Sequence, residues 1–237
     1  MSSADAAQVL GVSIRQVQRF VASGQLASRG TIGRNTLLDS ASVHRLAAVG
    51  TARGRTWKPI TVWMAMALLD GRNHIGRTDD ERAKVSRLRH RLRHMTADEL
   101  VRMTRYRADI TRWRGSDSFT DELRKRVVAT GELALDSRDG GPALARSLGL
   151  GVRSWDGHID GYVRADQLPD LERKFFLAHD SAGNVILRIT DAVDALADRN
   201  YGFRAAMPVV ALDLADSMDV RQRAAGLRVL TAMMERL

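Results

Sequence analysis

The sequence contains no cysteine, so disulfide bonds and thiolate-bound metals are excluded and nothing ties the chain to an oxidising compartment. No apolar run is long enough to cross a membrane. The first ten residues lack the basic start and apolar core of a signal peptide. From these absences we expect a cytoplasmic protein that does not associate with membranes.

The basic residues are concentrated in the front half of the chain. Residues 1–71 contain 8 Arg or Lys and 3 Asp or Glu, residues 72–126 contain 16 and 9, and residues 127–237 contain 13 and 16. Clustered cations displace counterions from a phosphate backbone, which favours a nucleic-acid partner for the front half. Nearly all of these cations are arginine, so genomic base composition is the alternative explanation.

The first residues predict two short helices separated by a glycine turn. The segment SADAAQVL favours a helix, and Gly11 interrupts it. Ser13 and Gln16 form a capping-box pattern, in which each side chain satisfies a free backbone amide at the start of a second helix. Two helices in this arrangement are typical of a helix-turn-helix.

The second predicted helix has one apolar face and one basic, amide-bearing face. Its apolar positions are Ile14, Val17 and Val21, with Phe20 at the margin. The candidate DNA-binding residues on the helix are Arg15, Gln16, Gln18 and Arg19. Arginine donates two hydrogen bonds to guanine and glutamine pairs with adenine, which predicts base contacts in the major groove. Two alternatives stay open: Gln16 serves as a cap instead, and the arginines form a solvated face.

A hairpin is predicted after Leu26, because Gly30 and Gly33 lie between two short segments that can pair. Arg29 and Arg34 flank its tip, where they can reach phosphates or a neighbouring minor groove. A third helix is expected to begin at Asp39 or Ser40. Residues 1–50 therefore predict a winged helix-turn-helix domain that binds double-stranded operator DNA.

The segment AAQVLGVSIRQVQRFVASGQLASRGTIGRNTLLDSASVHRLA resembles the winged helix-turn-helix of the excisionase and MerR-like families. The resemblance covers about the first fifth of the chain. It implies that the second helix enters the major groove and that the wing, residues 29–34, contacts the DNA backbone. The wing departs from the family pattern, since it lacks the aromatic residue often found where residues 35–37 stand.

Residues 51–126 are predicted to be a basic helical connecting region. The apolar stretch ITVWMAMALLDG favours a buried helix, and Thr78 to Glu81 and Thr96 to Glu99 fit the capping box of two further helices. In the first of these, Val85, Leu88, Leu92 and Met95 form the expected buried stripe. The arginines on its remaining surface either attract phosphates without sequence preference or form a solvated face, and the sequence leaves both open.

Residues 127–237 are predicted to be a mixed α/β domain that binds a partner or an effector. HIDGYVR, NVILRIT and MPVVALDLA are rich in β-branched or aromatic residues and are interpreted as strands. A final helix is expected from about Val220 to Arg236. The whole chain is therefore expected to be α+β and predominantly helical.

An enzymatic role is a weaker interpretation of this half. The His179-Asp180 pair, together with Asp213, Asp216 and Asp219, raises a metal-dependent phosphohydrolase as an alternative. Asp216 and Asp219 have a simpler explanation as charges near the positive end of the last helix. In the basic middle region, His74, His90 and His94 lack the spacing that a zinc site needs. We expect no catalytic residue, no metal and no cofactor.

The order of a small winged helix-turn-helix and a larger α/β domain, with NVILRIT and MPVVALDLADSMDVRQRAAGLRVL, resembles AbiEi-type antitoxins of actinobacteria. This resemblance implies an antitoxin that represses its own operon and counters a nucleotidyltransferase-like toxin. A homodimer is a further candidate, because two-fold operators commonly imply one. An excisionase-like architectural protein is the alternative from another class.

Overall fold

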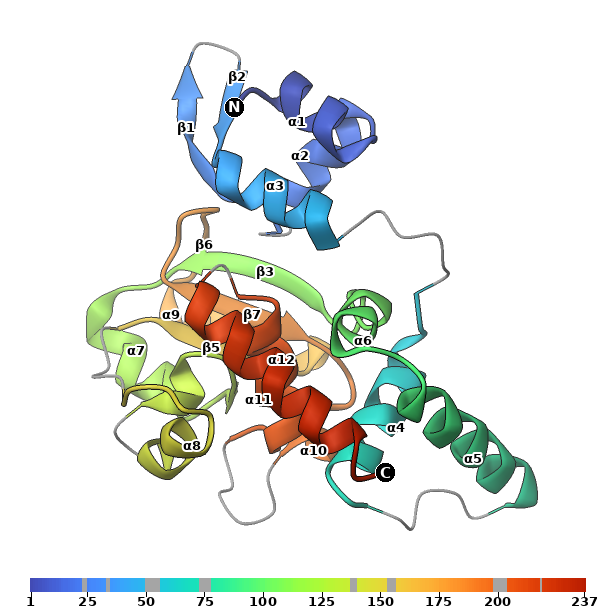
Figure 1. Ribbon diagram of the computed structural model, residues 1–237. Coiled ribbons are helices and arrows are strands. Elements are labelled where there is room, and N and C mark those ends of the chain that lie inside the picture. The colour runs from blue at the N-terminus through green and yellow to red at the C-terminus, as the bar shows by residue number, and fades with distance from the viewer. Residues whose placement is uncertain are drawn as a thin grey trace.

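The computed structural model describes residues 1–22, 25–32, 35–49, 56–72, 78–136, 140–152, 157–197, 204–217 and 219–237. Figure 1 shows a small N-terminal group of elements beside a larger body built from a sheet and helices. We call residues 1–49 the N-terminal unit and residues 56–237 the body. One hydrophobic cluster lies in the N-terminal unit and two lie in the body. The fold is α+β and mostly helical, as predicted.

The N-terminal unit consists of α1 (Ser3–Leu10), α2 (Ile14–Ala22), β1 (Ser28–Ile32), β2 (Asn35–Leu38) and α3 (Ser40–Val49). Helix α1 begins after Ser2, whose side chain forms a capping box with Asp5. It ends at Gly11, whose φ of 63° lies in the left-handed region that glycine adopts without steric cost. Strands β1 and β2 pair antiparallel, which confirms the predicted hairpin.

The body contains the helices α4 (Pro59–Leu69), α5 (Asp79–Arg93), α6 (Ala97–Met103), α11 (Met207–Ala215) and α12 (Val220–Met234). Capping boxes at Thr78 and Thr96 confirm the predicted starts of α5 and α6. The Asp219 side chain accepts hydrogen bonds from the first amides of α12, as its position in the sequence suggested. All five helices contribute to one hydrophobic cluster, so the middle region shares a core with the end of the chain.

Helix α11 corrects one prediction, because MPVVALDLA was interpreted as a strand. Its residues are buried on nearly every side, so the segment lacks the polar face that would reveal a helical period. Helix α12 packs closely along α11, and Gly226 lies directly against the backbone of Ala211 and Ala215. Any side chain at Gly226 would push the two helices apart.

The sheet of the body contains β3 (Asp109–Arg114), β4 (Val128–Ala129), β5 (Ile159–Val163), β6 (Ala178–His179) and β7 (Val185–Ile189). Its strand order is β4-β5-β7-β3-β6, with β5 and β7 parallel and the other pairs antiparallel. Strands β5 and β7 confirm two of the predicted strands. Strand β3 lies inside the region predicted to be helical, so that prediction is corrected there.

The remaining helices are short. They are α7 (Asp117–Arg124), α8 (Gly141–Ser147), α9 (Leu168–Phe175) and α10 (Val193–Leu196), with single 3-10 turns at Leu133–Leu135 and Ala165–Gln167. In the part of the chain that the structure describes, none of the helices has the length and apolarity needed to cross a bilayer.

The two faces of the sheet differ in chemistry. Side chains alternate between faces along a strand, so the register places Trp113, Ile159, Val185 and Leu187 on one face. These residues form an apolar cluster with α7 and α9. The register places a second set on the opposite face, which turns toward α11: Ile110, Arg112, Asp160, Tyr162, Ile186 and Arg188. The sheet thus buries charge on the side where α11 lies.

Candidate nucleic-acid interface and a charged cavity

Helix α2 presents the predicted basic face to solvent. Arg15, Gln18 and Arg19 are exposed, whereas Val17 and Phe20 are buried in the core of the N-terminal unit. The helix contains no acidic residue to neutralise the arginines. One detail of the prediction is wrong. Ile14 was expected on the buried face but is 48% exposed, whereas Phe20, which was expected at the margin of that face, is buried. The exposed face remains cationic and amide-bearing.

Gln16 lies at the edge of this face and is half-buried. Its backbone N–H donates to Ser13 Oγ at 3.2 Å, so half of the predicted capping box is present. Among the described residues, the Gln16 side chain accepts no hydrogen bond from the Ser13 backbone N–H, which would complete the box. The amide of Gln16 therefore is not held by the cap.

Arg29 of the hairpin is exposed but already has an acidic partner. The Arg29 side chain is 75% exposed, but its guanidinium lies 2.8 Å from the Asp39 carboxylate. Asp39 also accepts a hydrogen bond from the backbone N–H of Ser42 and so caps α3. A phosphate that contacts Arg29 would have to share it with Asp39. Arg34 lies outside the described residues.

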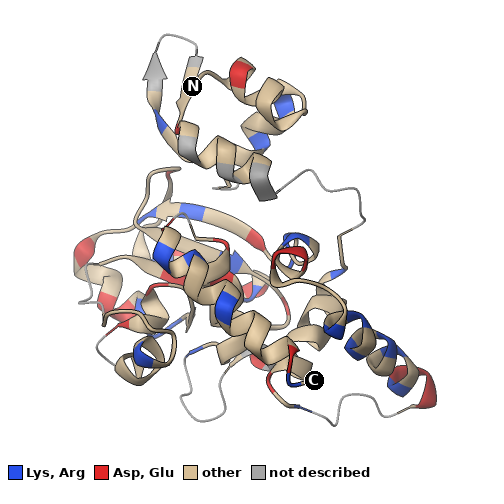
Figure 2. Ribbon diagram, viewed as in Figure 1, with Lys and Arg blue, Asp and Glu red and all other residues tan. Residues whose placement is uncertain are grey.

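The basic helix α5 is partly neutralised by its own residues, as Figure 2 indicates by the acidic cluster at its start. Arg82 pairs with Asp79, and Lys84 pairs with Asp80. Arg91 lies over the ring of Trp57, with its guanidinium carbon 5.1 Å from the ring centre. The solvated-face alternative therefore accounts for several of these charges.

A buried network of charges connects α11 with the polar face of the sheet. The Asp213 carboxylate is fully buried and accepts hydrogen bonds from Arg107, Tyr162 and Thr130. Arg188 donates to the same carboxylate at 3.3 Å and binds Asp160 through two nitrogens, at 2.7 and 3.0 Å.

Burial alone would raise the pKa of Asp213. The guanidinium groups of Arg188 and Arg107 outweigh that effect and hold the pKa below its ordinary value of 3.8. Asp213 is therefore charged in the folded protein. The same burial, together with the charge of Asp213, raises the pKa of Tyr162, so its hydroxyl stays protonated and donates.

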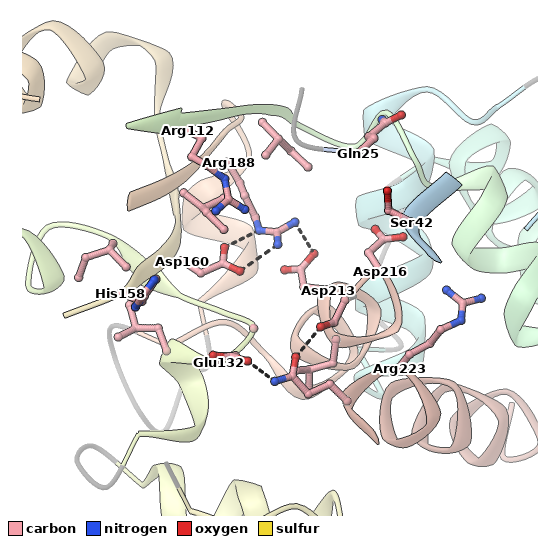
Figure 3. Close-up of a pocket in the computed structure, with 18 of the residues that line it drawn as sticks. Gln25, Ser42, Arg112, Glu132, His158, Asp160, Arg188, Asp213, Asp216 and Arg223 are labelled. Carbon is pink, nitrogen blue, oxygen red and sulfur yellow. Dashed lines mark hydrogen bonds and ion pairs between the residues drawn. The ribbon is translucent and has the colours of Figure 1, made fainter. Parts of the chain in front are cut away.

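A cavity of about 330 Å³ lies beside this network, between the body and the N-terminal unit (Figure 3). Arg112, Asp160 and Arg188 line it from the sheet. Asp213, Asp216 and Gln222 line it from α11, α12 and their connection, and Gln25, Ser42 and Leu46 line it from the N-terminal unit. The sequence analysis did not predict this cavity, which joins residues from three distant parts of the chain.

The residues weighed for an enzymatic role are occupied by structural contacts. The His179 ring stacks on Trp113 with 3.6 Å between ring centres, and Asp180 pairs with Arg114. Asp216 pairs with the buried Arg107 at 2.6 Å. Among the described residues, no group of three or more His, Asp or Glu side chains could hold a metal ion.

Comparison with known proteins gives no match: no family model fits the chain, and neither curated proteins nor solved structures show significant similarity to it.

Proposed function

We propose that this chain is a sequence-specific DNA-binding transcriptional regulator and that its N-terminal unit is a winged helix-turn-helix. The observation that carries the proposal is the exposed face of α2, on which Arg15, Gln18 and Arg19 lie opposite the buried Val17 and Phe20. Helix α2 enters the major groove, and the β1-β2 hairpin is the wing. The absence of acidic residues in α2 supports an anionic partner.

The chemistry of this face suits base recognition. A guanidinium presents two parallel donors to guanine O6 and N7, and a glutamine amide matches adenine N6 and N7. Arg15 and Arg19 lie four residues apart and therefore on neighbouring turns of one helix face. We assign base contacts to Arg15, Gln18 and Arg19, with Gln16 at the edge of the groove. Arg29 can contact the DNA backbone only if a phosphate replaces Asp39 as the partner of its guanidinium.

The test begins by selecting bound duplexes from a random library with the full-length protein. Affinity for the selected duplex is then measured by fluorescence anisotropy for the wild type and for Arg19→Ala. We expect the substitution to weaken binding by about 1–3 kcal/mol and to relax base preference at one position. The control is Arg173→Ala, which removes an exposed arginine of α9 that pairs with Asp170. Unchanged affinity and unchanged preference in Arg19→Ala would refute the assignment.

We further propose that the regulator is the autorepressing antitoxin of a toxin-antitoxin operon. The support is the resemblance of the chain to AbiEi-type antitoxins in the order of its elements and in the segments quoted above. The partner would be a nucleotidyltransferase-like toxin encoded beside it. In a growth assay, co-expression of this chain should rescue cells from that toxin. Arg19→Ala should still rescue while failing to repress the operon, and a neighbouring gene of another class would contradict the antitoxin role.

A further inference from the structure

The cavity between the N-terminal unit and the sheet has no role in DNA binding as proposed above. Its volume of about 330 Å³ lies at the lower end of the range of small-molecule sites. Its walls mix apolar side chains, such as Ile110, Ile186 and Leu214, with charged ones. The chemistry of a ligand depends on which of the charged groups lack a partner within the protein.

The carboxylates that line the cavity are engaged by other side chains. Asp160 is held by Arg188 through two nitrogens, and Asp213 lies at the centre of the buried network. Asp216 pairs with Arg107. Glu132 accepts a hydrogen bond from the side-chain amide of Gln222. Among the described residues, each carboxylate that lines the cavity therefore has a donor within the protein, and the cavity offers no unpaired carboxylate to bind a cation.

Arg112 is the exception among the charged groups from the sheet. Its Nη1 atom donates to the carbonyl oxygen of Gly183 at 3.3 Å. In the described part of the chain no carboxylate lies within ion-pair distance of it, although it is half-buried. Burial lowers its pKa, and this effect outweighs the opposing charge of Asp160, while Arg188 contributes a smaller lowering effect and Asp180 a smaller raising one. A bound anion would offset the cost of burying this charge.

The N-terminal unit provides a second unsatisfied group. The Gln25 Oε1 atom is buried and accepts no hydrogen bond in the described structure. A buried acceptor without a donor is unfavourable, so a ligand that donates to it relieves that cost on binding. Figure 3 shows Gln25 and Arg112 on different sides of the cavity, one from each part of the molecule.

We propose that this cavity binds a small organic anion whose carboxylate or phosphate is held by Arg112 and whose N–H or O–H group donates to Gln25 Oε1. A guanidinium presents a planar pair of donors that fits either kind of anion. Because Arg112 belongs to β3 and Gln25 to the N-terminal unit, the ligand bridges the two. Its binding therefore favours one placement of the N-terminal unit against the sheet.

The test uses the full-length protein without DNA, so that its result does not depend on the proposed function. Two matched pairs of probes are titrated by calorimetry: L-glutamate with glutarate, and phosphoethanolamine with ethyl phosphate. Within each pair the first compound carries an N–H donor that the second lacks. We expect binding by one pair at millimolar concentration or below, and that pair identifies the ligand as a carboxylate or a phosphate.

The variants assign the binding to the two residues. Arg112→Gln should weaken binding of both members of the pair at least tenfold, whereas Gln25→Leu should weaken only the member with the donor. Arg173→Gln removes an exposed arginine that does not line the cavity, and this variant should bind the probes like the wild type. Thermal unfolding without ligand checks that each variant folds. Failure of both pairs to bind, or full affinity in Arg112→Gln, would overturn the proposal.

Discussion

Replacing Asp213 with Asn removes the central charge of the buried network while keeping the size of the side chain. In the wild type, Asp213 accepts hydrogen bonds from Arg107, Tyr162 and Thr130 and from the more distant Arg188. The amide of asparagine keeps one oxygen acceptor but replaces the other with an NH2 group, which would turn its donors toward a group that is itself a donor. Arg107, whose side chain is 1% exposed, would lose one of its two carboxylates and keep Asp216, together with its hydrogen bonds to Tyr162 and Thr104.

The expected cost follows from the burial. Removing one partner of a buried ion pair typically costs about 3–5 kcal/mol. The lower end of this range is expected here, because Arg107 keeps Asp216 and Arg188 keeps Asp160. Whole domains are stable by only about 5–15 kcal/mol, so Asp213→Asn should lower the free energy of unfolding by a large fraction. Asp170→Asn, which breaks the exposed pair with Arg173, should cost less than about 1 kcal/mol and serves as the control.

The pKa of Asp213 gives this prediction a pH dependence. Its value in the folded protein lies below the ordinary 3.8, so the folded state holds the carboxylate charged more strongly than the unfolded chain does. The resulting stability is fully present above the unfolded pKa and is lost as the pH falls through the lower folded pKa. The difference in stability between wild type and Asp213→Asn should therefore shrink below about pH 4.

Urea unfolding followed by tryptophan fluorescence measures this effect in the body alone. The tryptophans are Trp57, Trp63, Trp113 and Trp155, so none lies in the N-terminal unit. Trp63 packs edge-on against Tyr162, with 5.8 Å between ring centres, and so lies next to the network. A loss below about 1 kcal/mol, or a loss equally large in strong acid and at neutral pH, would refute this account of Asp213.

Three further substitutions test other parts of the fold. Gly226→Ala should lower the free energy of unfolding by about 1–3 kcal/mol in the same fluorescence assay, because the new methyl group meets the α11 backbone at Ala211 and Ala215. An unchanged urea midpoint would contradict this packing. Phe176→Gly should raise the free energy of unfolding by about 1 kcal/mol, because Phe176 is 75% exposed and has a left-handed φ of 49° that disfavours any residue with a Cβ. The Phe176 ring lies 5.9 Å from that of Phe119, and a less stable variant would show that this contact matters more. Asp39→Ala should remove the cap of α3 at a cost of about 1 kcal/mol, which faster amide hydrogen exchange in α3 would reveal. Unchanged exchange would mean that α3 does not need the cap.

Features set by a few neighbouring residues could be predicted from the sequence. Thr78 with Glu81 and Thr96 with Glu99 mark helix starts through hydrogen bonds that span three residues, and both are present. The face of α2 was predictable because the apolar positions of a short amphipathic helix leave little choice of orientation. Phe20 lies in a core shared with α1, β2 and α3, whereas Ile14 is exposed, and no pattern within α2 contains these contacts.

Elements that derive their environment from distant parts of the chain were not predictable. Strand β3, with the sequence DITRWR, alternates between the apolar cluster and the charged face, but Arg112 faces charged neighbours supplied by residues 160 and 188. Helix α11 was taken for a strand because a short apolar run gives the same signal for either element. One sign of the network was present in the sequence: Asp213 is the only charged residue in MPVVALDLA, and a lone charge in an apolar run indicates a buried partner. Its partner Arg107 lies 106 positions away.

Because the partners in the body lie far apart in the sequence, the core of the body can be completed only late in synthesis. The core of the N-terminal unit draws on residues up to Ala47, whereas the largest core of the body draws on residues as late as Leu237. At typical translation rates the interval between these points lasts about 10–40 s. The residues of α2 and of the N-terminal core are therefore synthesised well before Asp213. Until Asp213 leaves the ribosome, Arg107 has no counterion from α11.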